Sequence, residues 1–173
     1  SGYGTGGTVS GVGRVLREKS PGTKIILTEP ENAALIGSEL KQDRHSDNTP
    51  ATSHPSWNPH LIQGWTPDFI PFVLQEAIDN NYFDKLLPVS GEQGITWAKR
   101  LARAEGIITG ISGGSTFAIA MEVAKDAPPD SNILCMLPDT GERYLSSPLF
   151  EEIPEEMTDD EKKISLSTPN YQL

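Results

Sequence analysis

The chain alternates short apolar runs with stretches in which apolar residues recur every three or four positions. Runs of five or six mostly apolar residues predict strands at residues 24–29, 85–89, 107–111 and 132–137. Apolar residues at helical spacing predict amphipathic helices at residues 9–19 and between Ser90 and Gly106, and a third helix from about Phe117 to Lys125. Ser90 followed by Gln93 is the capping-box pattern of a helix start, and Gly106 is the residue type that ends a helix.

Strands that alternate with helices in this way are typical of right-handed βαβ units. We therefore predict an α/β fold with a parallel twisted sheet and flanking helices, in a three-layer αβα arrangement. Residues 41–59 are polar and rich in proline and asparagine, so they predict a long surface loop. Ligands of such sheets bind at the carboxyl ends of the strands. Two turns rich in Gly, Ser and Thr are predicted at helix starts, at Gly4–Thr8 and Ser112–Thr116.

The first of these turns, Gly4-Thr5-Gly6-Gly7-Thr8, has the composition of a phosphate site. Glycines let backbone N–H groups converge, the helix start adds partial positive charge, and threonine hydroxyls add donors. Three interpretations stay open. The turn either holds the phosphate of a cofactor, is a structural turn, or belongs to a dinucleotide site in which Gly2, Gly4 and Gly7 form G-x-G-x-x-G and Glu29 binds the ribose.

The second turn offers Ser112. Its hydroxyl either donates to the ring nitrogen of a cofactor without charging it or caps its own helix.

Charge and composition exclude several classes of protein. The 173 residues carry 14 basic and 24 acidic side chains, a net charge of −10 with no Lys/Arg cluster, which disfavours a nucleic-acid partner. No apolar run approaches the length of a membrane span.

Cys135 is the single cysteine, so no internal disulfide forms. A cytoplasmic location is expected, and a location in a plastid or another organelle stays open. His45, His54 and His60 lack metal-site spacing and are predicted at the surface, with no metal site.

Four motifs occur in a fixed order along the chain. They are Gly4-Thr5-Gly6-Gly7-Thr8, His60-Leu61-Ile62-Gln63-Gly64, Gly110-Ile111-Ser112-Gly113-Gly114 and Gly141-Glu142-Arg143-Tyr144-Leu145-Ser146. In that order and at those separations they resemble cysteine synthase (O-acetylserine sulfhydrylase). The resemblance covers about Gly2 to Phe150 and only the second half of that family's chain. We therefore expect a pyridoxal-phosphate-binding domain at residues 1–150 and an acidic tail at residues 151–173.

The resemblance implies a pyridoxal 5'-phosphate enzyme of the tryptophan-synthase β type, fold type II. The family replaces the acetate of O-acetylserine with sulfide to give cysteine. By position, Gly4–Thr8 is expected to hold the cofactor phosphate, Ser112 to bind the pyridine nitrogen, and Gly64 to lie on the substrate side. The family's Schiff-base lysine would lie upstream of Ser1, so no catalytic residue is assigned in this chain. A homodimer is expected, and serine acetyltransferase is a candidate partner.

Other functions stay open beside this one. A cystathionine β-synthase-like enzyme would use serine and homocysteine, and a non-catalytic relative would bind a partner's C-terminal peptide. The competing class is an NAD-dependent oxidoreductase using Glu29. Under the pyridoxal-phosphate hypothesis Glu29 only ends a strand, and its replacement is expected to matter little. The family's small residues after Gln-Gly are replaced by Trp65-Thr66-Pro67-Asp68, which puts the substrate contacts of that loop in doubt.

Overall fold

A computed structural model describes residues 1–167 of the chain. Its helices and strands follow one another as α1 (Gly7–Lys19), β1 (Ile26–Pro30), η1 (Glu31–Ala33), α2 (Phe72–Asp79), β2 (Lys85–Val89), α3 (Gly91–Glu105), α4 (Ile111–Asp126), η2 (Gly141–Tyr144) and α5 (Asp159–Ser167). The strands and helices predicted in the first 106 residues are present within about two residues of their expected ends. The long loop at residues 41–59 contains only an isolated bridge between Arg44 and Pro50.

The sheet is small and parallel. β1 pairs with β2 in a register that sets Ile26 opposite Lys85 and Pro30 opposite Val89. The first residues of the chain lie beside β1, where Gly2 makes a parallel bridge to Thr28. The Thr28 N–H donates to the Ser1 carbonyl at 3.0 Å. The glycine turn that follows is therefore preceded by a strand-like segment, as in a strand-turn-helix unit.

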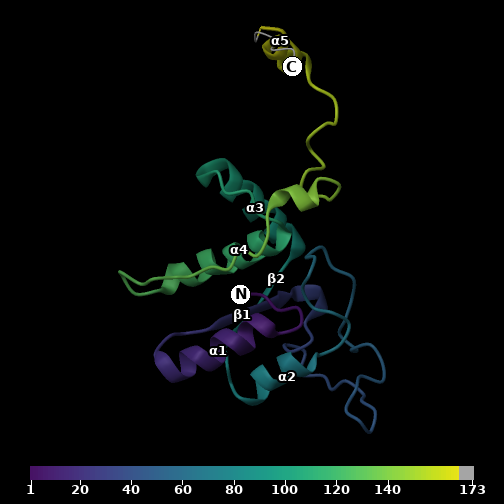
Figure 1. The fold of residues 1–173 in the computed structure, drawn as a ribbon, viewed down its shortest axis with the longest axis vertical. Helices are drawn as coiled ribbons and strands as arrows, with labels where there is room; N and C mark the ends of the chain where they lie inside the picture. Colours follow the sequence, from purple (N-terminus) through teal and green to yellow (C-terminus); the bar gives the residue numbers. More distant parts are fainter. Residues whose placement is uncertain (168–173) are drawn as a thin grey trace, which may run out of the picture.

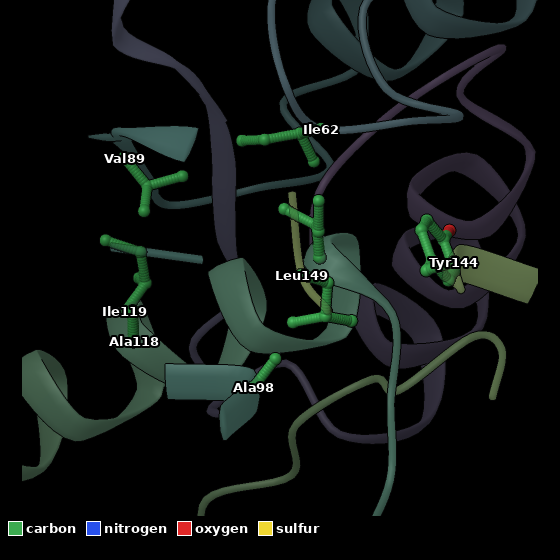
Figure 2. Packing of buried hydrophobic residues seen from close by; sticks show 8 residues of the cluster. Ile62, Val89, Ala98, Ala118, Ile119, Tyr144 and Leu149 are labelled. Atoms are coloured by element: carbon green, nitrogen blue, oxygen red, sulfur yellow. The ribbon is translucent and has the colours of Figure 1, made fainter. Parts of the chain in front are cut away.

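Helices lie on both sides of this sheet, with α1 and α2 on one side and α3 and α4 on the other (Figure 1). Two separate hydrophobic cores result. Leu27 of β1 packs with Val9 and Leu74 from α1 and α2. Val89 of β2 packs with residues of α3, α4 and the segment after η2, as Figure 2 shows; this core comprises Ile62, Val89, Ala98, Ile111, Ala118, Ile119, Tyr144 and Leu149. The α/β class and the helix layers are thus present around a sheet of two strands.

Small residues let α3 and α4 approach closely. A Cβ on Gly114 would lie 2.8 Å from the Cβ of Ala98, and one on Gly94 would lie 3.0 Å from the Ile111 carbonyl oxygen. The predicted capping box of α3 is confirmed. The Gln93 N–H donates to the Ser90 hydroxyl at 3.1 Å, and the Ser90 N–H donates to Gln93 Oε1 at 3.0 Å. The predicted end of the helix is also confirmed, because Gly106 is left-handed with φ 70°.

Two predicted strands are wrong. Residues 107–111 contribute only an isolated antiparallel bridge between Thr109 and Thr140, and residues 132–137 form no strand. An apolar run becomes a strand only when a neighbour pairs with its backbone, and within residues 1–167 no ladder or bridge includes the second segment. Four of its six residues are exposed, with Leu134 95% exposed, and Cys135 and Leu137 are partly buried.

Two helices also differ from the sequence prediction. α4 begins at Ile111, about six residues earlier than predicted, so the Ser112–Thr116 turn forms its first turns. α2 was not predicted, because its eight residues span barely two turns and give little periodicity.

The acidic C-terminal segment stands apart from the rest of the chain in Figure 1 and includes α5. Every residue from 151 to 167 is exposed, and α5 buries none. The last six residues of the predicted tail, 168–173, lie outside the described residues. Within the described part of the chain, no helix is both long and apolar enough to cross a membrane.

Candidate cofactor site

The glycine turn presents an uncapped helix start. Gly6 is left-handed with φ 91°, and α1 begins at the next residue with no side chain capping its first N–H groups. A Cβ on Gly6 would lie 2.6 Å from the backbone nitrogen of Leu74, so only glycine fits there. Thr5, Gly7 and Thr8 are exposed around it. In contrast to α3, whose start is closed by Ser90 and Gln93, α1 leaves its N-terminal donors free for an anion.

The turn is held against the loop that contains Gly64. A Cβ on Gly4 would overlap the Gly64 carbonyl oxygen, so the two backbones touch only because residue 4 is glycine. The Thr66 N–H also donates to the Tyr3 carbonyl at 2.9 Å. Gly64 itself is left-handed with φ 81°. The structure therefore brings together two of the predicted site segments, Gly4–Thr8 and Gly64.

Histidine and tryptophan side chains shape the Gly64 loop. The Ile62 N–H donates to His60 Nδ1 at 3.2 Å, so this nitrogen is unprotonated and Nε2–H donates to the Thr66 carbonyl at 3.2 Å. Trp57 Nε1–H donates to the same carbonyl at 3.1 Å. His54 is 2% exposed and uses both ring nitrogens on backbone groups. The prediction that His54 lies at the surface is therefore wrong. Its buried ring contacts the Leu40 carbonyl and the Ser56 N–H and so connects the two ends of the long loop.

Glu29 binds Tyr3, the residue that precedes the turn. Its buried carboxylate accepts hydrogen bonds from the Tyr3 hydroxyl at 2.5 Å, the Ile36 N–H at 3.1 Å and the Gly37 N–H at 2.8 Å. Burial first, and then the adjacent Glu29, raise the pKa of Tyr3. The carboxylate is 2% exposed and its oxygens face these three protein donors, so it is not accessible to a ribose. The dinucleotide hypothesis therefore loses its acidic residue, and the expectation that Glu29 only ends a strand is wrong.

Ser112 lies in the first turn of α4 and is 2% exposed. Gly110 is the N-cap residue and no side chain caps the helix, so the capping role considered for Ser112 is not observed. The Tyr144 hydroxyl lies near it and donates to Asp139 Oδ2 at 2.5 Å. Burial, and then the hydrogen bond to Asp139, raise the pKa of Tyr144 to about 12, while hydrogen bonding with Ser112 acts in the opposite direction.

A cavity of about 530 Å³ opens between the Gly64 loop and η2; its lining residues are Gln63, Asp139, Arg143, Tyr144, Ser146, Ser147 and Pro148. The residue before Gly64 and the tyrosine beside Ser112 thus face one space. The Gly4–Thr8 turn does not line it and is connected to it only through the contact of Gly4 with Gly64. Sequence reasoning missed Asp139 and named Tyr144 only within a motif. The sequence signal that could have pointed to this pair is a tyrosine and a carboxylate in one short segment, Asp139–Tyr144.

These residues suit pyridoxal phosphate at both of its ends. The phosphate would find the uncapped start of α1 with the exposed Thr5 and Thr8 hydroxyls, and the pyridine nitrogen would find the hydroxyl of Ser112. No lysine lines the cavity. Among residues 1–167, no group of three or more His, Cys, Asp and Glu side chains is arranged to hold a metal ion.

Comparison with known proteins agrees with this chemistry. The family described as "Pyridoxal-phosphate dependent enzyme" matches residues 1–139. O-ureido-L-serine synthase of Streptomyces lavendulae is 39% identical over 168 residues, which are 97% of this chain and 45% of that protein. Cysteine synthase of Staphylococcus aureus (strain N315) is 35% identical over 150 residues, 87% of this chain and 42% of that protein.

Solved structures show the same likeness. The crystal structure of O-ureido-L-serine synthase matches with a TM-score of 0.75 and 38% identity over 95% of this chain and 45% of that one. Cysteine synthase from Entamoeba histolytica matches with a TM-score of 0.68 and 29% identity over 98% of this chain and 44% of that one. The chain spans less than half the length of these relatives. The resemblance drawn from its four motifs is confirmed, and the chain belongs to the family of pyridoxal-phosphate dependent enzymes.

Proposed function

We propose that the protein containing this chain is a cysteine-synthase-type enzyme that replaces the acetate of O-acetylserine with a nucleophile. The observation that carries the proposal is the uncapped glycine turn at the start of α1, held by Gly4 against the Gly64 loop. When bound, pyridoxal phosphate supplies the electron sink for removing the α-proton and the acetate of the substrate.

The residues of the chain have distinct roles in this proposal. Backbone N–H groups at the start of α1 and the hydroxyls of Thr5 and Thr8 bind the cofactor phosphate. Ser112 donates a hydrogen bond to the pyridine nitrogen. Because a hydroxyl does not charge that nitrogen, the ring stays a moderate sink, which favours elimination at the β-carbon over transamination. Gly64 lies on the substrate side, where its left-handed backbone keeps the approach free of a side chain.

The nucleophile distinguishes two candidate reactions. Sulfide would give cysteine, the product named for the Staphylococcus aureus relative. The Streptomyces lavendulae relative shares more identity over more of the chain, and its name describes a serine carrying a ureido group on the side-chain oxygen. Both products bear a substituent on the β-carbon, so one replacement reaction yields either, with a hydroxyurea nucleophile in the second case. Homocysteine would give the cystathionine β-synthase-type product.

The test uses the full-length protein loaded with pyridoxal phosphate. O-acetylserine is supplied with sulfide, hydroxyurea or homocysteine in turn, and acetate and the amino-acid product are measured by chromatography and mass spectrometry. We expect acetate release with O-acetylserine and rapid product formation with one nucleophile. A colourless protein that takes up no pyridoxal phosphate would refute the proposal. Uptake without turnover would favour the non-catalytic binding module.

The expected homodimer, cytoplasmic location and serine acetyltransferase partner stay predictions. So does the division into a cofactor domain at residues 1–150 and an acidic tail. Sedimentation of the full-length protein, alone and with serine acetyltransferase, tests the first and last of these.

A further inference from the structure

Thr66 has a strained backbone. Its φ is 39°, in the left-handed region, which a β-branched residue rarely adopts. Thr66 is also 1% exposed. Among residues 1–167, the other non-glycine residues with a positive φ are all exposed, and most of them are Asn or Asp, which tolerate this region; they are Glu39, Asn48, Asn81 and Asp130. Strain of this kind persists only where the surrounding contacts hold it, and it is concentrated at functional sites.

The peptide groups on both sides of Thr66 are held by hydrogen bonds. Its N–H donates to the Tyr3 carbonyl at 2.9 Å. Its carbonyl accepts from Trp57 Nε1–H at 3.1 Å and from His60 Nε2–H at 3.2 Å. A change in φ turns the N–H of a residue relative to its carbonyl, so a relaxed Thr66 would lose its partners on one side. These hydrogen bonds therefore hold the strained conformation.

Residues 64–66 lie directly against the segment that leads into the glycine turn. The Gly64 carbonyl oxygen fills the space that a Cβ on Gly4 would take. The Trp65 ring fills the space that a Cβ on Gly2 would take. With the hydrogen bond of Thr66, each of the three loop residues contacts this segment.

The side chains of Trp65 and Thr66 do not face the cavity beside Gln63. Neither residue is among those that line it. The Trp65 ring packs against the hydrophobic core around Val89, and the Thr66 side chain is buried. Any effect of these two residues on a ligand in that region must therefore pass through the backbone of the loop.

We propose that Thr66 is a positioning residue, whose strained backbone, held from both sides, fixes the Gly64 loop at one distance from the glycine turn. The inference rests on the proposed function, in which Gly4–Thr8 holds the cofactor phosphate and Gly64 lies on the substrate side. The left-handed region open to a β-branched residue is narrow, whereas glycine has a broad range of φ. Thr66 therefore keeps the loop in one place, and glycine at this position lets it shift.

The test measures how well the loop receives O-acetylserine. Full-length protein is loaded with pyridoxal phosphate, and KM and kcat for O-acetylserine are determined from acetate release, with whichever of sulfide, hydroxyurea or homocysteine the native protein uses. Rates are divided by the amount of bound cofactor. A merely structural role lowers the amount of protein that holds the cofactor and leaves KM unchanged, so a change in KM reports positioning.

Three variants separate the contributions. We expect Thr66→Gly to raise KM about tenfold, because the loop is no longer held at one distance. Trp57→Phe removes one donor from the Thr66 carbonyl and is expected to raise KM by less. Thr66→Val keeps the β-branched shape and removes the hydroxyl, so its KM is expected to stay close to the native value. Trp97→Phe is the matched control for Trp57→Phe and is expected to leave KM unchanged, because Trp97 lies on α3, where its ring contacts Phe117 and Arg100.

The outcomes distinguish the positioning role from the proposed function. A native KM in both Thr66→Gly and Trp57→Phe overturns the positioning role and leaves the proposed function intact. A KM raised as much by Thr66→Val as by Thr66→Gly also overturns it, because the effect then belongs to the hydroxyl. No acetate release by the native protein contradicts the proposed function, together with the positioning role that rests on it. If Thr66→Gly fails to fold, Trp57→Phe decides the question, because it leaves Thr66 itself in place.

Discussion

Replacing Glu29 with glutamine is the sharpest test of how the glycine turn Gly4–Thr8 is supported. The carboxylate accepts from the Tyr3 hydroxyl and the Ile36 N–H through Oε2, and from the Gly37 N–H through Oε1. A glutamine amide has one oxygen. It keeps two of these hydrogen bonds if that oxygen takes the place of Oε2, and its NH₂ group then faces the Gly37 N–H, donor against donor.

The cost can be worked from these contacts. A buried donor left without a partner costs about 1–3 kcal/mol, and weakening the remaining charge-assisted bonds adds to it, for a total of about 2–4 kcal/mol. With a urea dependence of about 2 kcal/mol per molar, the unfolding midpoint falls by about 1–2 M. Glu29→Ala removes all three acceptor contacts and is expected to cost more. Since Tyr3 precedes Gly4, we also expect weaker pyridoxal phosphate binding.

The assay is urea unfolding of the cofactor-free full-length protein, followed by circular dichroism, with Glu31→Gln as the matched control. Glu31 lies two residues further along the chain and is exposed, so its replacement is expected to change stability by less than about 0.5 kcal/mol. Equal unfolding midpoints for Glu29→Gln and Glu31→Gln would refute the reasoning. The same result would revive the earlier expectation that Glu29 only ends a strand.

Three further predictions concern other parts of the chain. Gly4→Ala should abolish binding of pyridoxal phosphate in a fluorescence titration, because the added Cβ overlaps the Gly64 carbonyl oxygen. The control Gly11→Ala adds its Cβ in open space within α1, so this variant should bind the cofactor normally and gain about 0.5–1 kcal/mol in stability. Ser90→Ala should lower the free energy of unfolding by about 1 kcal/mol in thermal denaturation, and a change near zero would contradict the capping role. The Tyr144 phenol should titrate near pH 12, measured as the difference in ultraviolet absorbance between the native protein and Tyr144→Phe. Because this pKa lies above the unfolded value of about 10, the contribution of Tyr144 to stability is complete below pH 10 and is lost as the pH rises toward 12. A titration midpoint near pH 10 would disprove this prediction.

Local signals predicted the first half of the fold well. The strands at β1 and β2, the capping box at Ser90 and the left-handed Gly106 depend on residues near one another in the chain, and all are present. The runs at 107–111 and 132–137 carry equally good strand composition but do not form strands. A strand depends on a neighbour that composition does not specify.

The candidate site divides in the same way. Gly4–Thr8 and Ser112 were predicted as cofactor-binding residues because their residue types and order are distinctive, and that role stays a prediction. The roles of Glu29, His60, Asp139 and Tyr144 were missed, because each depends on a partner whose position in space the sequence does not give.

The sequence by itself determined the α/β class and the family, because these follow from local patterning and from the spacing of four motifs, and it predicted which residues hold pyridoxal phosphate. Only the tertiary structure decided that Gly4 touches Gly64, that Glu29 holds the residue before the glycine turn, and that Asp139 and Tyr144 meet against Gly110 at the start of α4. The physical reason is that a buried polar group must find its partner within the fold. Which group becomes that partner is settled by how distant segments pack rather than by their composition.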